Sequence, residues 1–243
     1  QPGEGLLLVW VSAIQIVMSI SSILVNNVAQ TTFLKRYGTE ALPLVFMIEA
    51  ILTFMFAGFV SILMERFRKI RVFTGLLLFY GISMGIIRIL ISMGVELAYP
   101  ALYILKSQAV GILPILYWDI LNDMFTTQQS KRLYTLISAG GILGVTIGSF
   151  MSRTLAGWVG VDNILVLFMG GMVIAAILNE LTEKVIGRPL QPRVVQSQEK
   201  SDRKYMIQLK RFIQEAKTSA LLKYMILLIA IPNLAAAGSA ASL

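Results

Sequence analysis

Long, uninterrupted apolar runs dominate this chain and leave few folds open to it. Seven runs have the length of a membrane span, and they cover about residues 6–28, 42–64, 72–94, 100–123, 133–156, 163–185 and 220–243. A helix rises ~1.5 Å per residue, so about 20 residues cross the ~30 Å hydrocarbon layer of a bilayer. Strands of a membrane β-barrel would instead alternate in pieces of about 10 residues. The sequence therefore predicts an all-α, multi-pass membrane protein.

The composition agrees with this fold class and narrows the chemistry. Hydrophobic residues make up 56% of the chain and charged residues 14%, whereas a soluble domain has about 25% charged residues. The chain has no His and no Cys. Their absence excludes disulfides, thiolate or imidazole metal sites and a Ser-His-Asp triad. Chemistry at neutral pH would then need carboxylates, Lys or Tyr, and the sequence shows no nucleophile–base pair. We therefore expect no catalytic residues, no metal and no cofactor, and no enzymatic activity.

The basic residues predict the orientation in the membrane. Most of the 21 Lys and Arg residues lie in the turn after the second span (MERFRKIR), in the turn after the fourth span, and in residues 184–223. The turns on the opposite side hold only Lys35 and Arg36. The positive-inside rule puts the basic side, the N-terminus and the 186–219 segment in the cytoplasm. We expect a bacterial inner-membrane protein, whose net charge of +8 reflects topology and not a nucleic-acid partner.

The order of the segments predicts three parts. Residues 1–185 form a six-helix bundle, residues 186–219 a basic loop with an amphipathic helix on the membrane surface, and residues 220–243 a seventh span. This layout is that of the first half of a 6+6 transporter with the start of the second half. Besides the lipid bilayer, we therefore expect a second transporter half, missing from this chain, as a partner.

A polar stripe runs along the whole first span. Its residues follow one another in steps of three or four: Ser12, Gln15, Ser19, Ser22, Asn26 and Gln30. Such steps place them on one helical face. The stripe either lines a water-filled path or forms hydrogen bonds to neighbouring helices. We favour a path and take Gln15, Ser19 and Asn26 as candidate substrate-binding residues.

Three ionisable residues lie inside predicted spans. Glu49, Arg88 and Lys106 lie on the second, third and fourth spans, about 9–12 Å from the outer end at ~1.5 Å per residue. A charge at this depth costs at least ~2–3 kcal/mol, so such residues face inward and pair. Two cations and one carboxylate suggest an anion site. The alternatives are a structural ion-pair lock, or long side chains that reach outward to the interface.

The fourth span completes the predicted path. It places Trp118 and Asn122, two further candidate substrate-binding residues, on the same face as Pro114. Proline lacks an N–H group, so Pro114 bends or loosens this helix. The span is either a moving gate or a helix with a static kink. We expect the first and fourth spans to line the path.

Opposite charges meet at the cytoplasmic turn between the fourth and fifth spans. Asp119 and Asp123 end one span, and Lys131 and Arg132 open the next. Ion pairs across this turn predict either a gate that breaks during transport or a static charged hairpin. The sequence is compatible with both the gate and the static hairpin.

Small residues repeat at four-residue spacing in the fifth span. Gly140, Gly144, Gly148 and Ser152 form a small-xxx-small pattern that lets two helices approach closely. Neither a preceding strand nor a following Lys-Ser/Thr pair is present, so the pattern does not fit a phosphate loop. We expect these glycines to act in helix packing.

The segment YWDILNDMFTTQQSKRLYTLISAGGILG, residues 117–144, resembles the ATP/ADP antiporter-like nucleotide transporters, which are allied to the major facilitator superfamily. The matching residues are Trp118, Asn122, Asp123, Lys131, Arg132, Tyr134 and Gly140. The chain departs from that pattern at residues 128–130, where Gln-Gln-Ser replaces the usual acidic residue before the Lys-Arg pair. The resemblance implies exchange of anionic nucleotides by alternating access.

Two rival functions remain. One is a proton-coupled carrier of another solute, with Glu49 as the proton site. The other is a transport-inactive membrane anchor or scaffold for partner proteins or fused soluble domains, because relatives of this type can carry such domains.

Overall fold

The computed structural model describes residues 4–186. The predicted amphipathic helix of the 186–219 segment and the predicted seventh span at 220–243 lie outside the described residues. The described part forms six α-helices and contains no strand. They are α1 (Glu4–Tyr37), α2 (Leu42–Arg66), α3 (Lys69–Ser92), α4 (Ala98–Met124), α5 (Thr127–Val159) and α6 (Ile164–Ile186).

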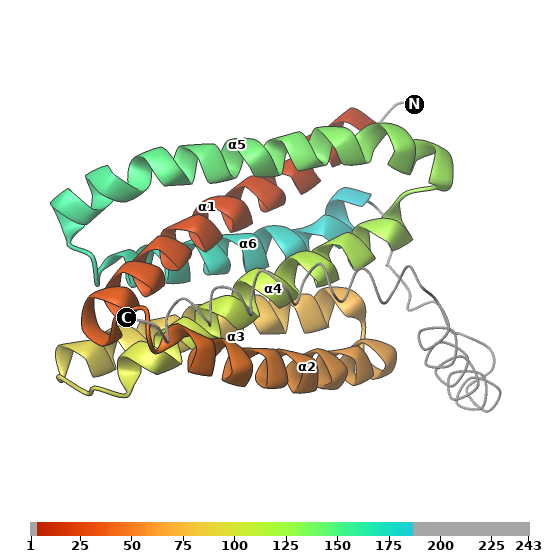
Figure 1. Ribbon diagram of the computed structural model, residues 1–243. Helices are drawn as coiled ribbons and strands as arrows, with labels where there is room; N and C mark the ends of the chain where they lie inside the picture. Colours follow the sequence, from red (N-terminus) through yellow and green to blue (C-terminus); the bar gives the residue numbers. More distant parts are fainter. Residues whose placement is uncertain (1–3, 187–243) are drawn as a thin grey trace, which may run out of the picture. The chain divides into compact units, whose positions relative to one another are not determined.

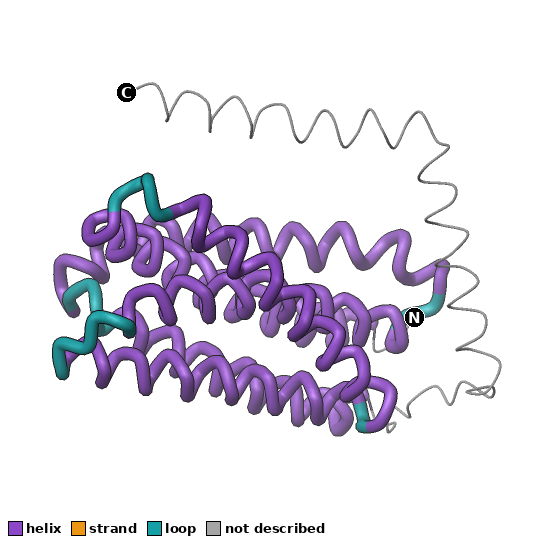
Figure 2. Tube along the Cα trace, turned by 60° about the horizontal axis from the view of Figure 1, so that its bottom comes forward, coloured by secondary structure: helices purple, strands orange, loops and turns teal. Residues whose placement is uncertain are grey.

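All six helices are long and apolar enough to cross a membrane. Figure 2 shows that only short connections join them. The predicted fold class, an all-α multi-pass membrane protein, is therefore confirmed for the described residues. The longest helices are α1 with 34 residues and α5 with 33, and both extend beyond the apolar runs that predict them.

Local sequence determines several helix ends. Thr126 precedes α5 and forms a capping box with Gln129, in which each side chain bonds the other residue's backbone N–H group. The α1–α2, α3–α4 and α5–α6 connections each contain a glycine with positive φ: Gly38, Gly94 and Gly160. Because a residue with a Cβ rarely adopts that conformation, glycine suits these turns.

Helix α1 runs through the middle of the bundle. It packs against α4, α5 and α6, while α3 packs against α4 and α6. Figure 1 shows α1 between α5 and α4, with α2 at the edge of the bundle. Side-chain hydrogen bonds join two of these pairs: Trp10 donates to Thr182 across α1 and α6, and Asn179 donates to Thr74 across α6 and α3.

The helix pairs follow an approximate two-fold pattern. In this pattern α1, α2 and α3 correspond to α4, α5 and α6. The contacts of α1 with α5 and α6 thus correspond to those of α4 with α2 and α3, and the pairs α1–α4 and α3–α6 correspond to themselves. Three helices form each unit and successive spans run in opposite directions. The units α1–α3 and α4–α6 therefore have inverted orientations, as any two successive sets of three antiparallel spans do.

The orientation predicted by the basic turns can be tested with single cysteines, because the chain has no native Cys. Lys35 near the end of α1 and Lys131 near the start of α5 are both exposed. We expect a membrane-impermeant thiol reagent to label Lys35→Cys in intact cells, and Lys131→Cys only after permeabilisation. The reverse labelling would contradict the positive-inside assignment.

Candidate functional site: a polar groove between α1, α4 and α5

The polar stripe of α1 lines a groove shared with α4 and α5. The groove has a volume of about 270 Å³. Its lining consists of Gln15, Met18, Ser19, Ser22, Ile23 and Asn26 from α1, Val110 and Pro114 from α4, and Val145 from α5. Four of the six stripe residues therefore share one cavity with the fourth helix, as expected for a path lined by the first and fourth spans.

The other two stripe residues have different surroundings. Ser12 lies against α5, where a Cβ at Gly140 would be 3.6 Å from the Ser12 Cβ. Gln30 donates a long, 3.5 Å hydrogen bond to Asn26 within α1. One residue of α1 outside the stripe binds another helix directly, since Asn27 donates to the Ser152 hydroxyl of α5 at 3.2 Å. The stripe therefore faces the groove mainly in its middle.

Pro114 leaves one main-chain carbonyl of α4 without its helical hydrogen bond. It lies inside α4 and has no N–H group to donate to the carbonyl of Val110, one turn earlier. Val110 and Pro114 both line the groove. The α4 wall thus contains a main-chain carbonyl without its usual helical donor.

A buried cation lies next to this groove. Lys106 of α4 is 6% exposed and donates a 3.2 Å hydrogen bond to the Asn26 carbonyl oxygen. Its ammonium also lies 4.1 Å from the ring centroid of Tyr103. Lys106 therefore does not reach outward to the interface, and one hydrogen bond separates its charge from a groove-lining side chain.

The Glu49 carboxylate attracts the Lys106 ammonium electrostatically. No ion pair joins the two residues in the described part of the chain. The Oε2 atom of Glu49 is buried without a hydrogen-bond partner. The cation is thus attracted by a carboxylate that does not neutralise it by direct contact.

Gln108 ties Glu49's helix to α4. Its amide donates to the Thr53 hydroxyl at 2.6 Å, which fixes α2 beside α4. The hydrogen bond between Gln108 and Thr53 was not predicted from the sequence. A Gln in the middle of a span is nevertheless a signal for an interhelical hydrogen bond.

Arg88 does not join the group formed by Lys106 and Glu49. Its Nε donates to Asn163 at 2.8 Å and its Nη1 to Ser92 at 2.9 Å. Asn163 lies just before α6, so Arg88 links α3 to the α5–α6 connection. The hydrogen bonds of Arg88 thus separate it from the two ionisable residues with which the sequence grouped it.

The ion pairs of Asp119 and Asp123 involve a different cation from the two predicted, Lys131 and Arg132. Lys69, at the start of α3, contacts Asp119 at 2.8 Å and Asp123 at 2.7 Å. Lys131 and Arg132 are exposed, and neither forms an ion pair with a described residue. The reason is packing. Asp119 and Asp123 are four residues apart and so lie on one face of α4, and α4 packs against α3.

Trp118 and Asn122 lie toward the C-terminal end of α4, and neither lines the groove. Tyr134 of α5 donates to Asn122 at 2.6 Å, and its ring contacts Trp118 edge-on with centroids 5.1 Å apart. Asn122 is eight residues beyond Pro114, or about 12 Å along the helix. These two candidates hold the α4–α5 turn together and do not line the cavity.

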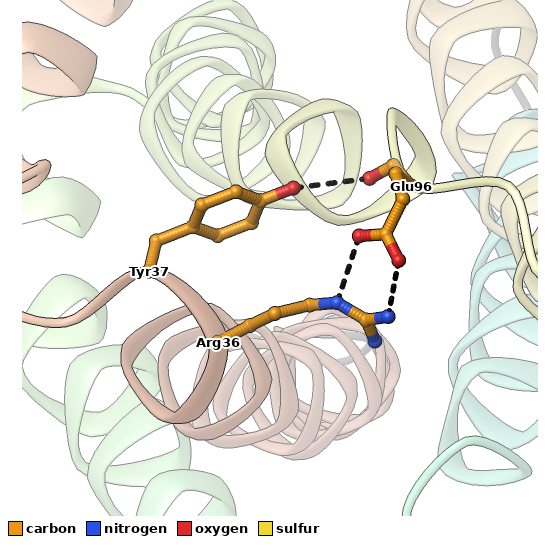
Figure 3. Close-up of polar contacts among 3 residues, drawn as sticks. All are labelled: Arg36, Tyr37 and Glu96. Carbon is orange, nitrogen blue, oxygen red and sulfur yellow. Dashed lines mark hydrogen bonds and ion pairs between the residues drawn. The ribbon is translucent and has the colours of Figure 1, made fainter.

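A bidentate ion pair closes the opposite end of the bundle. Arg36 at the end of α1 donates to both carboxylate oxygens of Glu96, at 2.9 and 2.5 Å, and Tyr37 donates to the Glu96 carbonyl (Figure 3). The Arg36 guanidinium also lies 4.2 Å from the centre of the Tyr99 ring. From the sequence, Arg36 contributed only to the predicted orientation in the membrane.

Glycines bring α1 and α5 close together beside the groove. A Cβ at Gly144 would lie 2.8 Å from the Ile16 carbonyl oxygen, and one at Gly148 would clash with Ile23. A Cβ at Gly140 would make only ordinary contacts. The closest approach of the two backbones is therefore near Gly144 and Gly148.

A second polar stripe runs along the outside of α5. Its exposed members are Gln128, Lys131, Thr135, Ser138, Thr146, Ser149 and Arg153. Their spacing places them on one helical face. The hydroxyls of Thr146 and Ser149 donate to carbonyl oxygens of α5 itself. The charged members Lys131 and Arg153 are costly in lipid, so they indicate water, headgroups or protein beside this face.

The contacts of Lys69 lead to a prediction about the stability of the α3–α4 contact. Lys69→Met would leave Asp119 and Asp123 side by side without their cation, and we expect a loss of about 1–2 kcal/mol because such partly exposed pairs contribute up to ~1 kcal/mol each. Thermal unfolding of the purified protein measures this. Asp123→Asn in the same background should restore part of the loss, whereas Lys131→Met should have little effect. Equal losses for Lys69→Met and Lys131→Met would contradict the assignment.

The described residues thus belong to an integral membrane protein with a polar groove between three of its helices. No family model matches this chain, and neither a curated protein nor a solved structure matches it.

Proposed function

We propose that this chain is the first half of a membrane transporter that moves an organic anion by alternating access, with nucleotides as the first candidates. The observation that carries the proposal is the buried ammonium of Lys106, which is bound to groove-lining Asn26 and has no ion-pair partner among the described residues. An ionisable residue in a membrane span is costly and is typically retained for function. A cation in this position suits an anionic substrate.

Two features of the bundle support transport over anchoring. The corresponding helix pairings of α1–α3 and α4–α6 are compatible with the inverted repeats of secondary transporters. The charged members of the polar stripe outside α5 and the polar groove beside it both need something other than acyl chains next to them. A second set of helices packed there would enclose the groove.

The groove residues suggest how an anion would be held. Lys106 supplies the positive charge, and the amide N–H groups of Gln15 and Asn26 and the hydroxyl of Ser19 supply hydrogen-bond donors. Glu49 attracts Lys106 when the groove is empty, and a phosphate or carboxylate of the substrate would take over that attraction. The ion pairs of Lys69 and Arg36 lie at opposite ends of the bundle, where an alternating-access cycle needs contacts that open in turn.

The test is exchange of labelled nucleotides by the protein in its full natural length, reconstituted in liposomes. We expect uptake of external ATP or ADP only when the liposomes contain unlabelled nucleotide. Uptake of a non-nucleotide anion would change the substrate class. Absence of uptake and of binding for every anion tested would overturn the proposal and favour the membrane anchor.

A second candidate, proton-coupled carriage, is favoured by Glu49, because its Oε2 atom is buried without a hydrogen-bond partner. Such a carboxyl is suited to take up and release a proton during transport. In this case an imposed pH gradient would drive uptake into liposomes without internal substrate. Glu49→Gln would abolish the gradient-driven uptake and leave exchange intact.

A further inference from the structure

A second groove lies between α2 and α3, and its chemistry differs from that of the polar groove. Its volume is about 410 Å³. The lining consists of Phe56, Phe59, Leu63 and Phe67 from α2 and the α2–α3 turn, and of Arg71, Val72, Gly75, Leu76 and Phe79 from α3. We call this the phenylalanine groove. It exists because α2 packs mainly on α4 and touches α3 only sparsely.

The phenylalanine groove begins at one end of the bundle and runs toward its middle. Phe67 and Arg71 lie at the α2–α3 turn, on the side predicted to be cytoplasmic, and Phe56 and Phe79 lie deeper. The depth is about 12 Å along α3 and about 16 Å along α2 at ~1.5 Å per residue. Half of the ~30 Å hydrocarbon layer has the same thickness. The groove therefore spans one leaflet.

The charge at the groove's mouth is positive. Arg71 lines the groove and is exposed, and Arg66 in the last turn of α2 is also exposed. Glu65 is the acidic residue of this turn, and it is outnumbered by the four cations of the sequence RFRKIR. Lys69 points to α4, where it binds Asp119 and Asp123. Arg71 is thus placed where a lipid headgroup would lie.

We propose that the phenylalanine groove binds an anionic phospholipid of the cytoplasmic leaflet. One acyl chain lies among the phenylalanine rings, and the headgroup phosphate is bound by Arg71 with Arg66 beside it. Basic pockets between spans on the cytoplasmic side are suited to such headgroups. An apolar groove that opens to the bilayer and carries a cation only at its mouth matches a molecule that is apolar along its length and anionic at one end.

Gly75 provides a sharp test, because it lines the groove and a Cβ there would meet no atom within 4 Å. Gly75→Leu should fill the groove without disturbing the helices. The matched control is Gly58→Leu on α2, since Gly58 is equally open but does not line the groove. Both changes have the same helix propensity effect, so a difference between them reports on the groove.

The measurement is the thermal unfolding midpoint of the full chain as phosphatidylglycerol is titrated into phosphatidylcholine vesicles. We expect a saturable rise for the native protein and for Gly58→Leu, and its loss for Gly75→Leu. Arg71→Gln should weaken the apparent affinity about fivefold, the effect of one basic residue near an anionic surface. Lys131→Gln, an exposed cation on α5, should change it less.

Two outcomes would overturn the proposal. One is an equal rise with phosphatidylcholine alone, which would mean that headgroup charge is not recognised. The other is an unchanged titration in Gly75→Leu; a change in oligomeric size of this variant would then identify the phenylalanine groove as a protein interface.

Discussion

Leucine at Gly144 is expected to prevent α1 and α5 from packing, whereas leucine at Gly157 on the same helix is expected to be tolerated. At Gly144 even a Cβ would lie 2.8 Å from the backbone carbonyl oxygen of Ile16, and at Gly157 it would meet nothing within 4 Å. A backbone atom cannot move aside as a side-chain tip can. We therefore expect Gly144→Leu to cost more than the ~1–3 kcal/mol of ordinary overpacking.

Alanine at the same two positions gives a graded version of this experiment. Replacing glycine by alanine inside a helix gains up to ~1 kcal/mol from propensity alone. Gly157→Ala should show that gain, while at Gly144 the clash should outweigh it. Thermal unfolding in a fixed detergent or nanodisc measures both pairs. Similar midpoints for the two leucine variants would mean that α1 and α5 are not held at this distance.

Removal of the Lys106 charge is expected to abolish anion binding without unfolding the protein. Methionine keeps the length and bulk of the side chain, but Lys106→Met leaves the Glu49 carboxylate without the cation that it attracts, and an uncompensated buried charge is destabilising. Lys106→Met combined with Glu49→Gln removes both charges and should therefore be the more stable variant. A buried, hydrogen-bonded charge typically contributes 2–5 kcal/mol to binding, so the affinity for an anion should fall at least about 30-fold. Lys35→Met, at an exposed site, is the control.

Ligand-dependent thermal shift separates the two parts of this prediction, because a ligand that binds only the folded form stabilises it. Without ligand, the midpoint of Lys106→Met should fall and that of Lys106→Met with Glu49→Gln should recover, while the shift with nucleotide should vanish in both variants. The effects of Lys106→Met and Asn26→Ala should not be additive, since the two residues share a hydrogen bond. A nucleotide shift of native size in Lys106→Met would remove this lysine from the proposed site.

The helices and the polar lining could be predicted because both depend on spacing along one segment. The apolar run at 42–64 became α2 with nearly the same limits. The four stripe residues in the groove were identified by their steps of three and four. The start of α5 was also readable, because Thr126 and Gln129 have the spacing of a capping box, yet the prediction placed the span start at 133.

The partners of the charged residues could not be predicted, because they depend on which helices pack together. Asp119 and Asp123 are close in sequence to Lys131, but α4 packs on α3 and so brings Lys69 to them. Counting residues along a span predicts how deep a charged side chain lies in the membrane. It does not predict toward which neighbouring helix an isolated charged side chain points. For this reason Arg88 was grouped with Lys106 and Glu49, whereas it binds Asn163 and Ser92.

Because α1 and α5 are long, the tilt of these two helices should depend on the thickness of the membrane. With 34 and 33 residues each helix is about 50 Å long, against a hydrocarbon layer of ~30 Å. Helices of this length tilt or extend past the bilayer, and mismatch costs fractions of a kcal/mol per Å. Because the polar groove lies between these two helices and α4, a thicker bilayer that draws them upright also changes the width of the groove.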